Sequence, residues 1–254
     1  MQVHVITLFP EMFRGPFDES IVRRAIDKGL VTITFHQLRD YTTDKHHTVD
    51  DYPYGGGSGM VMKPEPIFAA VDDVRSRVGQ ALPVIMMTPQ GRLFTQGVAD
   101  ELARLSGFIV FCGHYEGVDE RVHRYLASDE ISIGDYVLTG GELPAMVVLD
   151  AVVRLLPGAV GSPESVAEDS HRGGLLQHPL YTRPPEFRGW PVPEVLLSGN
   201  HQEVAKWRRR QAVLRTWQRR PDLLPKADLT DAERRWVEQL AAPPSADRPN
   251  DGGG

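Results

Sequence analysis

Two glycine-rich loops hold the side chains whose types and spacing are best suited to chemistry. The first, residues 113–117, reads GHYEG, and the second, residues 134–141, reads GDYVLTGG. Glu116 stands between two glycines, ahead of any expected helix, so a role in capping a helix explains it poorly. A carboxylate there can bind a cationic ligand or a metal ion. The second loop offers mainly backbone groups, with Asp135 and Tyr136, which suits a ligand bound by backbone hydrogen bonds and apolar walls.

Each loop directly follows a short apolar segment that predicts a β-strand, at residues 108–112 and 130–133. The alternation at 2–8, the helical spacing at 17–28 and the apolar run at 30–38 predict a β-α-β unit, whose strands must be parallel. Open parallel sheets bind ligands at the carboxyl ends of their strands. We therefore expect an α/β fold in which the two loops form one pocket.

Other elements follow from spacing and from proline and glycine punctuation. Between the first β-α-β unit and the next helix lies a long irregular loop, 39–63, whose length favours a functional role. The pattern predicts a strand at 83–87 that ends at the TPQG turn. Helices are predicted at 64–78, 95–105, 142–156 (amphipathic), 200–220 and 230–241, and an extended proline-rich segment at 178–199.

Composition limits the class of protein. The chain has 254 residues, a net charge of −6 and 41% hydrophobic residues, an ordinary soluble profile, so a nucleic-acid partner needs a local basic surface. A single cysteine, Cys112, excludes an internal disulfide and a multi-cysteine metal site, and its apolar strand predicts a buried structural thiol. No signal peptide is recognisable, and Asp150 and Arg154 interrupt the longest apolar run, so we expect a cytoplasmic protein.

The helix at 200–220 concentrates positive charge. Trp207 and Trp217 lie within it, and Glu203 is its only acidic residue. Basic residues interleaved with aromatic ones are typical of RNA binding, although a solvated face with tryptophans in a core is the alternative. The basic residues of this helix are Lys206, Arg208, Arg209, Arg210, Arg215, Arg219 and Arg220.

Several sequence motifs occur here in a fixed order. They include ITLFPEMF at residues 6–13, KHHTVDDYPYGGGSGMVMKPEP at 45–66, CGHYEGVDERV at 112–122, SIGDYVLTGGELPAM at 132–146 and HPLYTRP at 178–184. Together with TPQG, RLLPG, EDS and the SGNH…KWRRRQAVLRTW run, they resemble bacterial tRNA (guanine-N1)-methyltransferases, the TrmD type of the SPOUT superfamily. The resemblance covers residues 1–242.

This resemblance implies a parallel α/β sheet with a deep trefoil knot, formed by the two glycine loops, and a small C-terminal helical domain. Within the knot such proteins bind S-adenosylmethionine in a bent form. Glu116 is also a candidate ligand of Mg²⁺. The residues implied around the cofactor are Thr88, Pro89, Gly113, Tyr115, Glu116, Gly117, Ser132, Ile133, Gly134, Asp135, Tyr136, Val137, Leu138, Gly140 and Gly141.

The resemblance also implies domains and partners. It predicts a knotted methyltransferase domain at 1–160 and a tRNA-binding helical domain at 178–242, while composition predicts a flexible linker at 161–177 and a disordered tail at 243–254. Such proteins are homodimers whose active sites are shared between subunits, and the helical domain grips the tRNA anticodon arm. The implied target is guanine 37, next to the anticodon, whose methylation supports reading-frame maintenance.

Methylation of guanine at N1 requires a base that removes the N1 proton and a cation near O6. Asp169 and Arg154 match the family motif and are the candidates for these two roles. Without the resemblance, Asp169 reads as a solvated carboxylate and Arg154 as a partner of a helix dipole. Further candidates for RNA contact are His46, Asp50, Tyr181, Arg183, Ser198, Asn200, Lys206, Trp207 and Arg208.

The sequence departs mildly from the family pattern, where we expect Arg more often than His114 and Ser more often than Thr88 or Thr139. Three alternative functions are considered: ribose 2′-O-methylation, RNA binding without catalysis, and an atypical dehydrogenase. The absence of a GxGxxG motif disfavours the dehydrogenase. Likewise, the Walker A, GxSxG and HExxH motifs of common nucleotide-binding proteins, hydrolases and metalloproteases do not occur.

Overall fold

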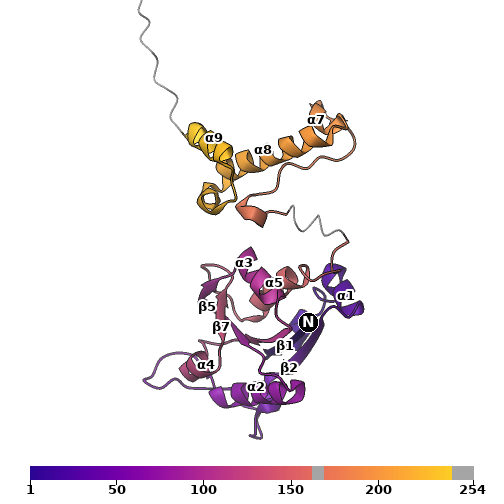
Figure 1. The fold of residues 1–254 in the computed structure, drawn as a ribbon. Helices are drawn as coiled ribbons and strands as arrows, with labels where there is room; N and C mark the ends of the chain where they lie inside the picture. The colour runs from indigo at the N-terminus through magenta and orange to yellow at the C-terminus, as the bar shows by residue number, and fades with distance from the viewer. Residues whose placement is uncertain (162–168, 242–254) are drawn as a thin grey trace, which may run out of the picture. The chain divides into compact units, whose positions relative to one another are not determined.

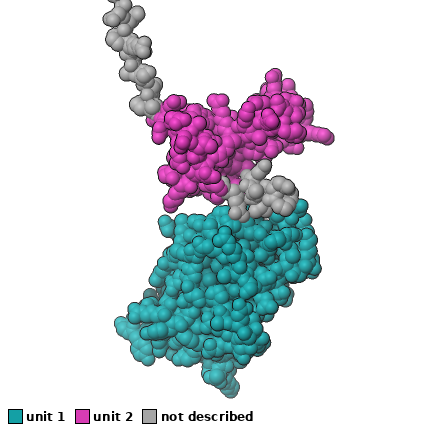
Figure 2. Space-filling view, in the orientation of Figure 1, with its two compact units in different colours: residues 1–163 teal, residues 164–254 magenta. Residues whose placement is uncertain are grey.

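The computed structural model describes residues 1–161 and 169–241, and the chain divides into two compact units. Unit 1 is Met1–Pro163 and unit 2 is Glu164–Gly254, coloured separately in Figure 2. The predicted tail at 243–254 and part of the predicted linker, 162–168, lie outside the described residues. Across the described ranges, no helix is both long and apolar enough to cross a membrane.

Unit 1 is built on a five-stranded sheet whose order is β2-β1-β6-β5-β7 (Figure 1). Every pairing in this sheet is parallel, so the predicted α/β class with a parallel sheet is confirmed. The strands are β1 (Gln2–Thr7), β2 (Thr32–Gln37), β5 (Val84–Leu93), β6 (Gly107–Cys112) and β7 (Asp129–Ser132).

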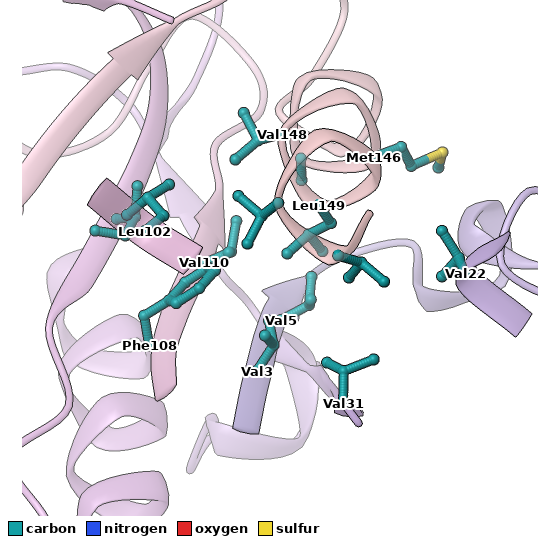
Figure 3. Close-up of a cluster of buried hydrophobic side chains, with 14 of the residues drawn as sticks. Val3, Val5, Val22, Val31, Leu102, Phe108, Val110, Met146, Val148 and Leu149 are labelled. Atoms are coloured by element: carbon teal, nitrogen blue, oxygen red, sulfur yellow. The ribbon is translucent and has the colours of Figure 1, made fainter. Parts of the chain in front are cut away.

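Helices cover both faces of the sheet because the central strands are apolar on both sides. On one face, Val3 and Val5 of β1 and Phe108 of β6 pack with α1 (Ser20–Asp27), α3 (Gln96–Ala103) and α5 (Glu142–Val153), as Figure 3 shows in part. On the other, Ile6 and Ile109 pack with α2 (Pro64–Val78) and α4 (Glu120–Tyr125). Burial of every residue of β6 fixes this strand at the centre.

Strand β5 is longer than the sequence predicts, because it continues through the TPQG segment to Leu93. Its register with β7 shifts between Met87 and Arg92, and pairing resumes at Arg92 and Leu93. Gly91 permits this, since a Cβ there would lie 2.4 Å from the backbone of Glu130. The predicted end at residue 87 is therefore wrong, because pairing with β7 overrides the local proline and glycine signals.

Helix α5 ends at Val153, before the predicted residue 156, and it is apolar on more than one face. Leu149 and Val153 are buried in the core, whereas Leu143 and Val147 are about half exposed. The prediction of an amphipathic helix is wrong here. The exposed apolar side leaves a surface that unit 1 does not cover.

Short elements complete unit 1. They are η1 (Pro10–Phe13), η2 (Leu38–Tyr41), β3 (Asp50–Asp51) and β4 (Val61–Met62), of which β3 and β4 pair antiparallel within the predicted long loop.

Unit 2 is organised around α8 (His201–Arg219), which Asn200 caps by accepting a hydrogen bond from the Glu203 amide. Its core joins Val213 of α8 to Leu175 and Leu224, so the last part of the segment expected to be a linker packs into this unit. The segment expected to be extended, 178–199, carries a small hairpin and a helical turn. The other elements are η3 (Arg172–Gly174), β8 (Glu186–Phe187), β9 (Trp190–Pro191), α7 (Glu194–Leu197), η4 (Pro221–Lys226) and α9 (Asp231–Ala241).

Candidate active site

A cavity of about 320 Å³ lies where β6 and β7 end, beside the middle of β5 at residues 86–90, and both glycine loops wall it. Its walls include the residues predicted around the cofactor except Asp135, whose side chain is exposed and outside the lining. The lining residues that were predicted are Thr88, Pro89, Gly113, Tyr115, Glu116, Gly117, Ser132, Ile133, Gly134, Tyr136, Val137, Leu138, Gly140 and Gly141.

Sequence reasoning missed part of the cavity wall. Met87 and Ile131 belong to the strands themselves, and periodicity gives no sign of which strand residues reach the cavity. His114 was noted only as a departure from the family pattern. His123 was not singled out at all, yet its Nδ1 lies 2.9 Å from Glu130 Oε1. Loop composition could have identified His114, whereas His123 required the packing of α4 against β7.

Backbone hydrogen bonds fasten the two loops to each other. The Gly141 amide donates to the Gly113 carbonyl at 2.9 Å, and His114 forms an isolated antiparallel bridge with Gly140. The long loop is joined to the same place, because the Glu116 amide donates to the Met60 carbonyl at 3.1 Å. Three chain segments, the two glycine loops and the long loop, are therefore joined around the predicted single pocket.

A chain of hydrogen bonds fixes η2, where the long loop begins. His4 Nδ1 lies 3.0 Å from His36 Nε2, His36 Nδ1 lies 2.9 Å from the Tyr41 hydroxyl, and Tyr41 donates to Asp73. Burial and the bond to Asp73 raise the pKa of Tyr41 to about 12. From η2, Arg39 donates to the Tyr115 hydroxyl at 3.3 Å, which ties this anchor to the cavity.

The thiol of Cys112 is buried and free. Burial, and then the negative charge of Glu142, raise its pKa well above the ordinary value. A thiol held protonated in this way is a poor nucleophile, which agrees with the predicted structural role.

The two candidate catalytic residues belong to different units. Arg154 is the half-buried residue at the C-terminal end of α5 in unit 1. Asp169 lies in unit 2, where it lines a second cavity of about 340 Å³ with His178, His201 and Arg208. Neither residue lines the cavity between the glycine loops.

Among the candidates for RNA contact in unit 2, some have structural partners. Lys206 forms an ion pair with Glu203 at 2.8 Å, and Asn200 caps α8. Trp207 is half-buried and packs its ring against His178 and Tyr181. Exposed side chains are those of Tyr181, Arg183, Ser198, Asn200, Lys206 and Arg208. In unit 1, His46 is exposed in the long loop and Asp50 pairs with Met62.

Other cations of α8 are also engaged in the fold of unit 2. Arg209 binds Glu233 of α9 at 2.7 Å, and this bond, with those from Thr230, lowers the pKa of Glu233 to about 2. Arg210 stacks over Trp236, 5.2 Å from the ring centre, and Arg215 donates to the Gln177 carbonyl. Part of the predicted basic surface therefore stabilises the unit itself.

The described residues contain no group of three or more His, Cys, Asp or Glu side chains that could hold a metal ion. Within those ranges, Glu116 therefore does not belong to a preformed metal site.

A glycine-walled cavity at the carboxyl edge of a parallel sheet is typical of ligand-binding α/β proteins. The family described as tRNA (Guanine-1)-methyltransferase TrmD matches residues 1–226. The chain belongs to this family. The resemblance predicted from the motifs is thereby confirmed, and with it the prediction of a methyltransferase.

Curated relatives agree with this assignment over nearly their whole length. A "tRNA (guanine-N(1)-)-methyltransferase" of Dehalococcoides mccartyi is 58% identical over 242 residues, 95% of this chain and 98% of the relative. A protein of the same name from Moorella thermoacetica is 57% identical over 243 residues, 95% of this chain and 97% of the relative. A third, from Anoxybacillus flavithermus, is 56% identical over 239 residues, 94% of this chain and 98% of the relative.

Proposed function

We propose that this protein transfers a methyl group from S-adenosylmethionine to N1 of guanine 37 in tRNA, next to the anticodon. One observation carries the proposal: in a member of this family, all but one of the residues expected to bind the methyl donor line one cavity. Since tRNA is its substrate, the enzyme would act in the cytoplasm. Methylation at this position supports maintenance of the reading frame.

The cavity suits S-adenosylmethionine in chemistry. Ile133, Val137 and Leu138 supply apolar walls, while the loops supply backbone groups that can bind an adenine or an amino-acid end. When bound, the cofactor supplies a methyl group on a sulfonium centre, already activated for transfer. We also propose the trefoil knot implied by the resemblance, and the bond between Gly141 and Gly113 places the segment after β7 against the end of β6, as such a knot requires.

Asp169 accepts the N1 proton of guanine in this mechanism, and Arg154 stabilises the negative charge that develops at O6. Arg154 stands 12 residues after the start of α5, which touches the cavity, so the two ends of the helix are about 18 Å apart. This separation supports an Arg154 that serves the cavity of a second subunit.

A homodimer follows from the same reasoning. Leu143 and Val147 of α5, with Met12 of η1, expose apolar surface that a second copy of unit 1 can cover. Two copies joined there would share their active sites.

Unit 2 grips the anticodon arm in this account. Its exposed cation Arg208 and its exposed aromatic Tyr181 provide phosphate contact and base stacking. Mg²⁺ at Glu116 would need further ligands from the RNA or the cofactor, because the described residues supply no cage around it.

The test is transfer of labelled methyl groups to unmodified tRNA transcripts varied at positions 36 and 37. We expect methylation of the transcript with guanine 37 and none when this base is changed to adenine. Retained methylation of the altered transcript would overturn the target assignment, and a methyl group on the ribose would favour the 2′-O-methyltransferase alternative.

A further inference from the structure

The wall between the two glycine loops contains a buried carboxylate that faces a histidine. Glu142, the first residue of α5, is only 1% exposed. Its Oε1 accepts a 2.6 Å hydrogen bond from the Thr7 hydroxyl, whose oxygen in turn accepts the Phe9 amide. Its Oε2 lies 3.9 Å from Nδ1 of His114. A buried carboxylate is costly unless donors surround it, so this histidine is placed where a donor is needed.

The Nδ1 atom of His114 faces Glu142 without a hydrogen bond. His114 Nδ1 is buried, and within the described ranges it makes no hydrogen bond. The ring is held between Phe9 and Tyr115, whose ring centres lie 5.1 Å and 5.4 Å away. An orphaned buried nitrogen is uncommon in native proteins and asks for an explanation.

Gly140 of loop two lies beside both polar ends. A Cβ at this position would fall 2.4 Å from His114 Nδ1 and 2.4 Å from Glu142 Oε2. Because Gly140 has no side chain, no side-chain atom of this residue stands between His114 Nδ1 and Glu142 Oε2. The pair therefore connects loop one, which carries His114, to the helix that begins directly after loop two.

We propose that His114 and Glu142 are positioning residues that clasp the two loops around the methyl donor. When the donor fills the cavity, the loops approach and His114 Nδ1–H donates to Glu142 Oε2. A movement of about 1 Å turns the 3.9 Å contact into a hydrogen bond. This inference rests on the proposed use of S-adenosylmethionine, and it assigns donor affinity to a contact between His114 of the cavity wall and Glu142, which does not line the cavity.

The test compares donor binding by His114→Ala, His114→Arg and Glu142→Gln in the full-length protein, by calorimetry with S-adenosylmethionine and S-adenosylhomocysteine. We expect His114→Ala and Glu142→Gln to raise the dissociation constant about tenfold, since the first removes the donor and the second replaces the carboxylate acceptor with a neutral amide. His114→Arg restores a donor toward Glu142 and should bind within about threefold of the wild type. Arg23→Ala, on the exposed surface of α1, is the matched control.

A second readout separates the clasp from a merely structural role. In the clasp, His114→Ala changes the melting temperature of the ligand-free protein little and reduces the increase caused by the donor. An equal loss in both states, or unchanged donor affinity, would overturn the clasp while leaving the proposed methyl transfer intact. No donor binding by the wild type would overturn the proposed function and the clasp together. On addition of S-adenosylhomocysteine, the ¹⁵N signal of His114 Nδ1 should shift as it gains an acceptor.

Discussion

Two glycine-rich loops wall the cavity of unit 1, whereas α8 of unit 2 presents closely spaced cations. In unit 1, backbone groups bring two loops together, as the bond between Gly141 and Gly113 shows. In unit 2, some long charged side chains bind another element of the unit, as Arg209 binds Glu233, and some are exposed, as Arg208 is. Adding one methyl group near the cavity of unit 1 should therefore change donor affinity strongly. Removing single charges from unit 2 should change tRNA binding or stability by smaller amounts.

The largest effect should come from the proposed general base. Asp169→Ala should lower the rate of methyl transfer by about 10²- to 10⁴-fold, because N1 of guanine cannot lose its proton unaided. Donor binding should stay unchanged, which calorimetry can verify. The control is Asp222→Ala, an exposed carboxylate of unit 2 that pairs with Arg220. A near wild-type rate for Asp169→Ala would remove Asp169 from the mechanism.

Gly140→Ala tests the claim that unit 1 depends on close packing at the glycine loops. The added methyl group would collide with His114 and Glu142 at 2.4 Å, so donor affinity should fall by roughly 10- to 100-fold. Gly97→Ala in α3 is the control, because its Cβ would meet only Thr95 Oγ1 at 3.6 Å. Equal donor binding by the two variants would contradict the tight contact at Gly140.

Leu143→Asp tests the apolar surface of α5. Placing a charge there should weaken the proposed dimer at least about tenfold, and methyl transfer should fall with it. Sedimentation velocity over a range of protein concentrations measures the association. Leu105→Asp, at another exposed apolar position, should not change the oligomeric state. A wild-type protein that stays monomeric would contradict the shared active site.

Two neighbouring arginines of α8 should differ in what they contribute, one to tRNA binding and the other to the stability of unit 2. Arg208→Ala should weaken tRNA binding by about fivefold and reduce the slope of affinity against salt by about one, as expected for a lost phosphate contact. Arg209→Ala should instead lower the melting temperature of unit 2, because Glu233 loses its partner. Filter binding at several salt concentrations measures the effect on tRNA affinity, and calorimetric unfolding measures the effect on stability. If Arg208→Ala lowered stability and Arg209→Ala weakened tRNA binding, the assigned roles would be wrong.

The smallest effect concerns acid stability. The pKa of Glu233 falls from 4.5 in the unfolded chain to about 2 in the fold, so its contribution is complete above pH 4.5 and is lost as the pH falls toward 2. After allowance for the partly exposed Arg209, we expect about 1–2 kcal/mol. Thermal unfolding between pH 2 and 6 measures it, and Glu233→Gln should flatten this dependence. An unchanged slope would assign the acid sensitivity to other groups.

The parallel sheet and the position of the cavity could be predicted because both rest on local patterns: apolar runs that end in glycine loops. The continuation of β5 could not, since pairing with β7 overrides a Thr88-Pro89 signal that normally ends a strand. Contacts between distant residues were equally hidden. Thr7 and Glu142 are 135 positions apart, and Arg209 meets Glu233 only because α8 and α9 pack together. Charge composition alone could not reveal which basic side chains form contacts within unit 2.

The most direct test of the central claim is the identity and position of the methylated nucleoside. A tRNA transcript is incubated with the enzyme and S-adenosylmethionine, digested, and analysed by mass spectrometry, with a second sample fragmented to locate the methyl group. We predict 1-methylguanosine at position 37 and at no other position. A methyl group on a ribose, on another base or at another position would contradict the assignment of this cavity to guanine N1 methylation.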